Sequence, residues 1–151
     1  MPQLTLHSPT GELTLSEEAG HIVALDWGRG PKEFQAETPL LLRAKRQLED
    51  YFAGKLTEFD LPLAPAGSEF HRQVWQIMRE IPFGYTMTYG DIAKRLGAVA
   101  RAVGTACGAN PIPIIIPCHR VLGAGGKMVG FSGKGGVETK VALLQLEKVL
   151  L

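Results

Sequence analysis

The sequence contains only two cysteines, Cys107 and Cys118, among its 151 residues. Two thiols cannot supply the disulfide framework of a small secreted domain, and no zinc site with the usual cysteine and histidine spacing can be assembled. No apolar run is long enough to span a membrane, and residues 1–6 lack the basic residues and the long apolar stretch of a targeting peptide. We therefore expect a cytoplasmic protein with no metal and no membrane partner.

The charge is nearly balanced over the whole chain but not within its halves. The formal net charge is +1, yet residues 1–67 hold six Lys/Arg against ten Asp/Glu, a net charge of −4, while residues 68–151 hold ten against five, a net charge of +5. A basic half that contains Cys118 favours a polyanionic partner such as DNA, because Lys and Arg set against phosphates release counterions. Ordinary surface charge of a small domain remains the alternative.

The first half has the pattern of a small antiparallel sheet followed by a helix. Apolar residues alternate or cluster between Pro, Gly and Glu-rich turns in three predicted strands, 4–6, 11–15 and 21–27. Residues 39–52 carry apolar side chains at helical spacing, and Gly54 follows as a C-terminal cap would. Pro62 and Pro65 mark a stretch that resists regular structure and predicts a linker.

The second half is predicted to be mainly helical. Ser68 precedes a helical pattern that ends at Pro82, and Thr88 can cap a short helix that Gly97 breaks. A second short helix over 100–108 completes a helix-turn-helix, although its small side chains suit tight helix packing equally well. A last amphipathic helix runs to Glu147, and from this pattern alone Glu147 is expected on the surface.

Residues 110–121 read Asn-Pro-Ile-Pro-Ile-Ile-Ile-Pro-Cys-His-Arg-Val, so a buried isoleucine run leads directly to Cys118 and His119. A cysteine becomes a nucleophile when a base or a positive charge favours its thiolate, and we expect His119 and Arg120 to provide that bias. The alternative is an inert core cysteine after an apolar segment. The glycine-rich residues 123–136 do not match the phosphate-binding pattern that ends in Gly-Lys-Ser/Thr.

Four motifs of the chain together resemble one protein family. They are Pro117-Cys118-His119-Arg120-Val121, Arg101-Ala102-Val103-Gly104, Asn110-Pro111 and Leu143-Leu144-Gln145-Leu146-Glu147. In these motifs the chain is similar to the O6-alkylguanine-DNA alkyltransferases, also called methylated-DNA–protein-cysteine methyltransferases. The resemblance implies an α+β protein with a ribonuclease H-like domain and linker at residues 1–67. It implies a DNA-binding and alkyl-transfer domain with a helix-turn-helix at residues 68–151.

The resemblance also implies roles for individual residues. Cys118 is similar to the alkyl acceptor, His119 to the histidine that takes its proton through a water, and Glu147 to the acid that orients this histidine. Asn110 corresponds to the residue that braces the turn before the cysteine. Arg101 corresponds to the arginine that replaces an extruded base. The implied DNA-binding residues are Arg101, Tyr89, Ala102 and Thr105. The implied substrate-binding residues are Tyr89, Val121, Ser132 and Lys140.

The function implied by this resemblance is direct repair of O6-alkylguanine, and also of O4-alkylthymine, in duplex DNA. The alkyl group would pass irreversibly to Cys118 of a monomer that acts once and needs no cofactor. Two alternatives stay open from the residues: a module that senses the lesion without transfer, and a cysteine hydrolase using Cys118 and His119. Phe131 stands where tyrosine is frequent in the family, and the loop over 132–137 is longer than in many relatives.

Overall fold

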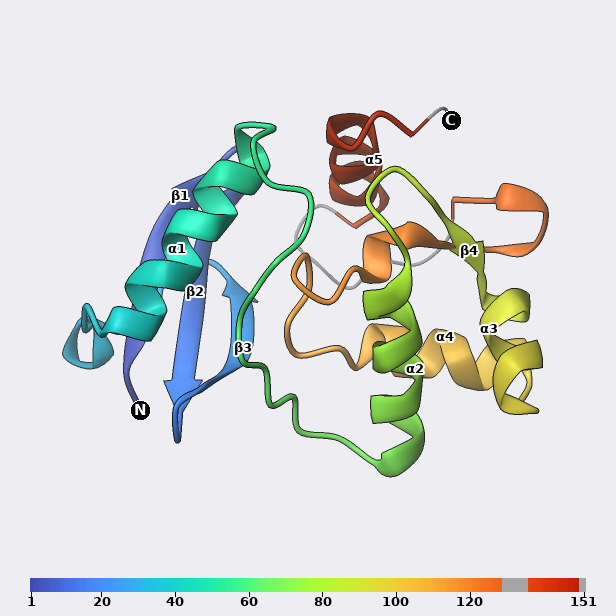
Figure 1. Ribbon diagram of the computed structural model, residues 1–151, viewed down its shortest axis with the longest axis horizontal. Helices are drawn as coiled ribbons and strands as arrows, with labels where there is room; N and C mark the ends of the chain where they lie inside the picture. The colour runs from blue at the N-terminus through green and yellow to red at the C-terminus, as the bar shows by residue number, and fades with distance from the viewer. Residues whose placement is uncertain (129–135, 150–151) are drawn as a thin grey trace. The chain divides into compact units, whose positions relative to one another are not determined.

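The computed structural model describes residues 1–128 and 136–149. The chain folds into two compact units, residues Met1–Ala66 and Gly67–Leu151, which run from blue to green and from green to red in Figure 1. The first contains a three-stranded antiparallel sheet and a helix, and the second is mainly helical. The predicted α+β class, with its sheet first and its helices second, is confirmed.

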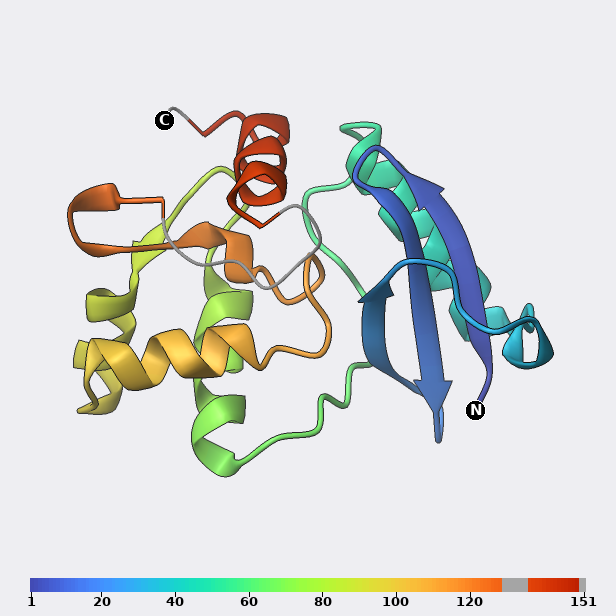
Figure 2. The same cartoon turned by 180° about the vertical axis from the view of Figure 1, so that it is seen from behind.

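The sheet of the first unit pairs its strands in chain order. Its strands are β1 (Gln3–Ser8), β2 (Gly11–Glu18) and β3 (His21–Trp27). Successive side chains of a strand point to opposite faces, so alternate leucines gather on one face. Leu6 pairs with Leu13, Leu15 pairs with Leu25, and all four are buried. Figure 2 shows the three strands from behind.

Helix α1 (Pro39–Phe52) packs against β1 and β2, as Figure 1 shows. Its first turn is fixed by Thr38, whose hydroxyl accepts a hydrogen bond from the Leu41 N–H at 3.1 Å. Pro39 at the first helical position costs no hydrogen bond, since that N–H has no partner within a helix. One stripe of the helix is buried, including Leu41, Leu48 and Tyr51. The predicted bounds of this helix are confirmed because local signals mark both ends.

The stretch around Pro62 is more ordered than the linker that its composition predicts. Its backbone pairs with β3: the Ile22 N–H donates to the Pro62 carbonyl at 2.8 Å, and the Ala64 N–H donates to the Ile22 carbonyl at 3.0 Å. Proline has no N–H, but its carbonyl can still accept, so Pro62 is tolerated beside an edge strand. The irregular part before Ser68 is therefore shorter than expected.

The second unit consists of short helices joined by turns. They are α2 (Glu69–Glu80), α3 (Tyr89–Leu96), α4 (Ala100–Gly108) and α5 (Val137–Leu146). Ser68 caps α2, as expected, by accepting from the His71 N–H at 3.1 Å. Helix α2 is fastened to α4 by Trp75, whose indole N–H donates to the Ala106 carbonyl at 2.8 Å.

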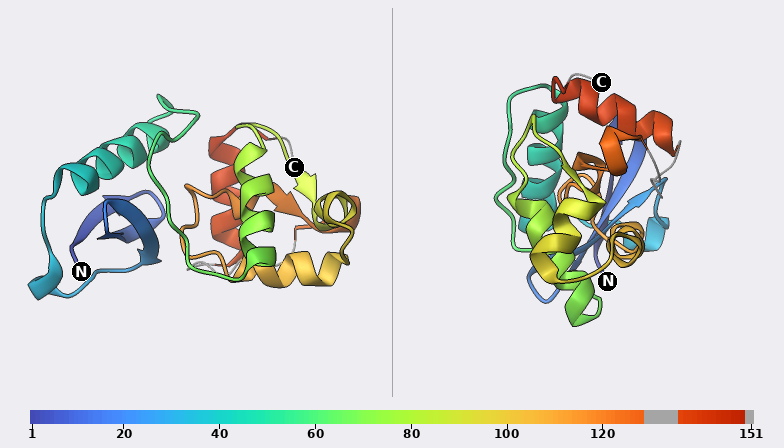
Figure 3. Two further views of the ribbon diagram at one scale, coloured as in Figure 1. Left: turned by 60° about the horizontal axis from the view of Figure 1, so that its bottom comes forward. Right: turned by 90° about the vertical axis from the view of Figure 1, so that its right-hand side faces the viewer.

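Helices α3 and α4 form the predicted helix-turn-helix. Thr88 and Asp91 satisfy each other's backbone N–H groups in a capping box at the start of α3. Gly97 ends the helix in the left-handed conformation, with φ of 63°, which glycine adopts without a steric cost. Figure 3 shows α3 nearly end-on where α4 runs across the view, so the two helices cross steeply.

A two-stranded parallel pair joins the start of α3 to the cysteine motif. Strand β4 (Met87–Thr88) pairs with β5 (Val121–Leu122). Two-residue strands leave no periodicity in a sequence, so this pair was not predicted. Its consequence is structural: the strand that precedes Tyr89 is paired with Val121, the last residue of the cysteine motif, and with Leu122.

Candidate active site

The isoleucine run before Cys118 is buried, but it is an irregular turn and not a strand. Ile114 has φ of 72°, and the Ile115 N–H donates to the Pro113 carbonyl at 2.9 Å. A hydrogen bond between residues two apart, with a positive φ at the residue between them, defines the rare γ-turn. This conformation is strained for a β-branched residue. The strained residue therefore lies in the turn that leads to Cys118.

Asn110 braces that turn from inside. Its amide Nδ2 donates to the Ile116 carbonyl at 2.8 Å, and its Oδ1 accepts from the Ile112 N–H at 2.9 Å. The Ile116 carbonyl also accepts from the Cys118 N–H at 2.8 Å. One side chain thus ties both ends of the turn to the backbone that positions the cysteine.

Cys118 begins the short 3-10 helix η2 (Cys118–Arg120) and is 7% exposed. Burial raises the pKa of its thiol above the ordinary range. A hydrogen bond from the Asn110 side chain and the positive charge of Lys140 oppose this shift without reversing its direction. The resting sulfur is therefore a thiol. The expectation that its neighbours hold it as a thiolate is wrong, because desolvation dominates.

His119 and Glu147 form a buried hydrogen-bonded pair. The distance between His119 Nε2 and Glu147 Oε2 is 2.7 Å, and both side chains are excluded from solvent. Glu147 directly follows α5, whose packing against η2 brings the carboxylate inward. The surface position that the helix pattern alone predicts for Glu147 is wrong, because tertiary contact and not helix amphipathicity places this residue.

Arg120 completes this cluster. The sequence predicts it as a charge that favours the Cys118 thiolate, whereas in the structure it binds Glu147. Its Nε donates to Glu147 Oε1 at 2.8 Å, and its Nη2 donates to Glu147 Oε2 at 3.0 Å. Its Nη1 donates to the Ile81 carbonyl at 2.7 Å, and the guanidinium lies 5.9 Å from the Phe83 ring centroid. The available signal was an arginine within an otherwise apolar stretch, where a buried cation needs a partner.

His119 is poised as a base. Burial lowers its pKa below the ordinary value, although the Glu147 carboxylate acts in the opposite direction. An ionised carboxylate only accepts hydrogen bonds, so Nε2 carries the proton that Glu147 binds. The other nitrogen, Nδ1, is buried without a hydrogen-bond partner among the described residues. In this tautomer the free lone pair of the imidazole is on Nδ1.

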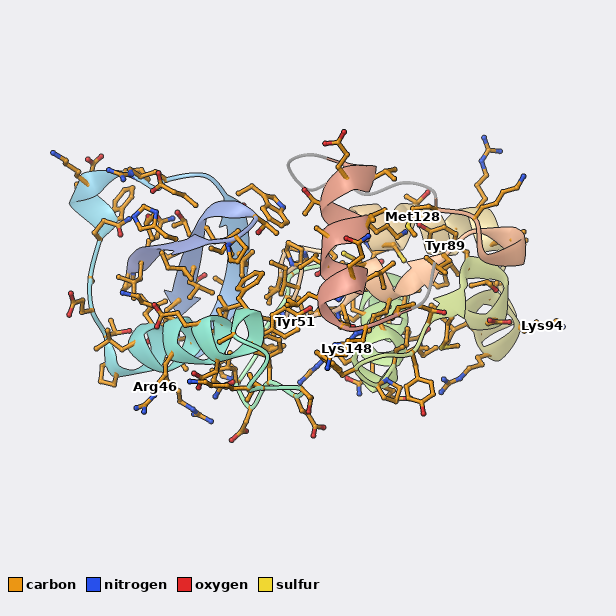
Figure 4. All side chains as sticks on the ribbon, turned by 90° about the horizontal axis from the view of Figure 1, so that it is seen from above. Arg46, Tyr51, Tyr89, Lys94, Met128 and Lys148 are labelled. Carbon is orange, nitrogen blue, oxygen red and sulfur yellow. The ribbon has the colours of Figure 1, made fainter. Side chains whose placement is uncertain are left out.

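Lys140, Tyr89 and Val121 lie together next to this cluster. The Lys140 ammonium is buried and donates to the Val121 carbonyl at 2.6 Å, and it lies 5.9 Å from the Tyr89 ring centroid. Burial, followed by the nearby Cys107 and Cys118, raises the pKa of Tyr89 to about 12, so its phenol keeps its proton. Figure 4 shows Tyr89 at the start of α3 and Lys94 pointing away from the same helix.

Three of the four predicted DNA-contacting residues lie on α4 and not with Tyr89. Arg101 and Thr105 are exposed on α4, Ala102 is half-buried, and the Thr105 hydroxyl donates to the Arg101 carbonyl at 3.2 Å. Gly104 lies on the same helix, and apart from its chain neighbours and the backbone of its own helix no described atom comes within 4 Å of a Cβ built on it. Small residues therefore leave the backbone of α4 accessible beside Arg101.

The structure thus sorts the predicted site residues into two groups. One is a mostly buried cluster: Cys118, His119, Glu147, Asn110, Val121, Lys140 and Tyr89. The other is on α4: Arg101, Ala102 and Thr105. Ser132 and Phe131 lie outside the described residues.

Within the described ranges no group of three or more His, Cys, Asp or Glu residues is arranged to hold a metal ion. In those same ranges no helix has the length and apolar character of a membrane span.

Two family models match the chain over nearly its whole length. The model described as "6-O-methylguanine DNA methyltransferase, DNA binding domain" matches residues 69–149. The model described as "6-O-methylguanine DNA methyltransferase, ribonuclease-like domain" matches residues 3–65. The chain belongs to this family. It is a DNA repair methyltransferase with a DNA-binding domain, and the predicted family is confirmed.

Relatives of this methyltransferase from distant organisms agree with the assignment. A methylated-DNA–protein-cysteine methyltransferase of Methanosarcina acetivorans is 43% identical over 148 residues, which cover 93% of this chain and 94% of the relative. The constitutive enzyme of Bacillus subtilis is 40% identical over 156 residues, covering 96% and 94%. A crystal structure of Mycobacterium tuberculosis OGT in complex with DNA is 45% identical, with a TM-score of 0.86, and covers 98% of this chain and 93% of that one. Membership of this methyltransferase family decides against the hydrolase alternative.

Proposed function

We propose that this chain repairs O6-alkylguanine in duplex DNA by irreversible transfer of the alkyl group to Sγ of Cys118, and that O4-alkylthymine is a second substrate. The observation that carries the proposal is the buried pair of His119 and Glu147, which leaves the Nδ1 lone pair available in the residue next to the thiol. A buried thiol with a neutral base nearby reacts only when a substrate enters and the proton can leave.

DNA recognition is assigned to residues 68–151 and in particular to α3 and α4. The basic charge of this half supports phosphate contacts, and the exposed Arg101 and Thr105 with half-buried Ala102 face away from the protein core. Cys118 is too buried to reach a base stacked within a duplex, so the alkylated nucleotide must rotate outward. Extrusion costs a few kcal/mol, and Arg101 offsets it by filling the space that the base leaves.

The extruded guanine is assigned to the surroundings of Tyr89. The Tyr89 ring packs near the purine, while the backbone carbonyls of Val121 and Cys118 accept from the guanine amino group. Lys140 already donates to the Val121 carbonyl, but a carbonyl oxygen has two lone pairs and can accept a second donor. The N–H of Ser132 is proposed to meet the guanine O6 atom, and this residue lies outside the described ranges.

The reaction is a displacement at the alkyl carbon. The Cys118 thiol passes its proton through a water to Nδ1 of His119, and Glu147 stabilises the imidazolium through Nε2–H. The sulfur attacks the alkyl carbon as the bond from that carbon to guanine O6 breaks. The proton then returns to the guanine anion, so the products are unmodified guanine and an S-alkylcysteine. A thioether is chemically stable, and no residue described near Cys118 would reverse it, so each monomer acts once.

Mass spectrometry on the protein after incubation with O6-methylguanine duplex tests this proposal. We expect one methyl group on the peptide that contains Cys118 and none after Cys118→Ser. Cys107→Ser is the matched control, because Cys107 is also a buried free thiol and should not be needed for transfer. Methyl on Cys107, or on neither thiol, would contradict the assignment.

Both thiols are free, which supports a reducing compartment such as the cytoplasm.

A further inference from the structure

Arg120 donates hydrogen bonds to both oxygens of the Glu147 carboxylate. Planar guanidinium and carboxylate groups match in this two-bond geometry, which fixes orientation as well as charge. The guanidinium is itself held from the other side by the Ile81 carbonyl and the Phe83 ring. Arg120 therefore orients the Glu147 carboxylate and places a positive charge beside it.

Arg120 and His119 both bind the Glu147 carboxylate, and they differ in the protonation state of the carboxylate that they favour. Arg120 favours an ionised carboxylate, because its guanidinium is positively charged and donates to both oxygens, one of which would carry the proton of a neutral carboxyl group. His119 can bind either form: it donates Nε2–H to an ionised carboxylate, or it accepts at Nε2 from a protonated one. Only the first arrangement leaves the lone pair on Nδ1. The partner that selects this arrangement is Arg120, since it neutralises the buried negative charge that would otherwise attract a proton.

We propose that Arg120 is a positioning residue for alkyl transfer, which keeps Glu147 ionised and thereby holds His119 as the neutral Nε2–H tautomer with Nδ1 free to accept the Cys118 proton. This inference rests on the proposed function for its consequence. The tautomer itself is a property of the free protein and can be measured without substrate.

The groups facing His119 support this assignment. The charged groups acting on its ring are Glu147 and Lys140 from the α5 segment and Arg120 from η2. Helix α2, which also packs against η2, buries only apolar side chains. Desolvation, followed by the two cations, lowers the pKa of His119, whereas Glu147 raises it. Removing Arg120 leaves Glu147 with less compensation, so a proton settles on Glu147 or on His119.

Either outcome blocks the base in the same way. If the proton is on Glu147, its O–H donates to Nε2 and the imidazole proton moves to Nδ1. If the proton is on His119, both ring nitrogens carry a proton. Raising the pH removes the extra proton in both cases. Loss of Arg120 should therefore shift the rising part of the pH–rate profile to higher pH, which a merely structural loss of packing would not do.

The test is ¹⁵N NMR of the histidine ring nitrogens in the free protein, combined with the single-turnover rate on free O6-benzylguanine against pH. The wild type should show His119 as the neutral Nε2–H tautomer at pH 7. Arg120→Met should show protonated Nδ1, a rate lower by at least about tenfold at pH 7, and partial recovery at higher pH. Arg120→Lys keeps a cation beside the carboxylate and should keep the wild-type tautomer.

Two outcomes overturn the inference. One is a wild-type His119 that carries a proton on Nδ1 at pH 7, which is decisive even if Arg120→Met fails to fold. The other is an Arg120→Met protein with the wild-type tautomer and an unshifted pH profile. Failure of the proposed function looks different: the tautomer is as expected, but wild-type Cys118 acquires no alkyl group.

Discussion

The Asn110 amide and the Cys118 N–H donate to the same carbonyl, that of Ile116, each at 2.8 Å. Asn110, eight positions before the nucleophile, thus binds the same backbone carbonyl as the N–H of Cys118. Because the second bond of Asn110, from the Ile112 N–H, holds the beginning of the turn, one side chain controls the path of the chain into the site.

Two substitutions of Asn110 should separate the contributions of its two hydrogen bonds to stability. Asn110→Asp keeps an oxygen for the Ile112 N–H but loses the donor to Ile116, whereas Asn110→Ala loses both. We expect destabilisation of about 1–3 kcal/mol for Ala and less for Asp, since each unpaired buried group carries a desolvation cost. Urea unfolding measures this, with the transfer rate to Cys118 in parallel. An Asp variant that is no more stable than the Ala variant would contradict this order.

At Ile114, a glycine variant should be more stable than an alanine variant, which is the reverse of the usual order of stability. Both substitutions remove a buried side chain, but only glycine adopts φ of 72° without strain. We therefore expect Ile114→Gly to be more stable than Ile114→Ala by about 1 kcal/mol. Ile112, also fully buried but without a positive φ, is the matched control, and its Gly variant should be the less stable one. Thermal unfolding of the four variants decides between these orders.

Arg101→Ala should slow repair of duplex DNA much more than reaction with the free alkylated base. Extrusion costs a few kcal/mol, so losing the residue that offsets it should lower the duplex rate by more than about tenfold. The free base has no stack to leave, and its rate serves as the internal control. Equal slowing on both substrates would contradict the role of Arg101 in extrusion.

Gly104→Ala should stabilise the protein and weaken DNA binding. A mid-helix glycine costs about 1 kcal/mol relative to alanine, and no described atom opposes the added methyl group. The same methyl group lies on the helix that we propose meets the duplex, where it would hinder close approach. Thermal unfolding and duplex affinity at fixed salt measure the two effects, and reaction with free alkylated base should stay unchanged. A stabilised variant with normal affinity would place the DNA surface elsewhere.

The transfer rate should remain high at mildly acidic pH. An ordinary histidine takes up a proton near pH 6.5, but the pKa of His119 is lowered, mainly by burial. Only the neutral ring accepts the Cys118 proton, so activity is present above the lowered pKa and lost as the pH falls through it. We expect the rate on free O6-benzylguanine to be nearly constant down to about pH 6.5. A rate that falls to half of its maximum at or above that pH would contradict the lowered pKa of His119.

Local sequence signals were sufficient for much of the fold. Residues 39–52 and 100–108 form the helices that were expected, because the apolar spacing that predicts them lies within the segments themselves; Thr38 also caps the first, whereas no side chain caps the second. The pair of β4 and β5 was missed, since two-residue strands have no periodic pattern. The isoleucine run was expected to be buried, but its path is set by Asn110 and a strained turn and not by strand propensity.

The sequence by itself determined the family, the nucleophile motif and the order of the helices, because each depends on residues that are neighbours in the chain. Only the tertiary structure decided that Cys118 rests as a thiol, that Glu147 is buried, and that Arg120 binds it. The physical reason is that desolvation and charge pairing depend on which groups share a buried volume. Glu147 is 28 positions from His119, and packing of α5 against η2 brings the two together.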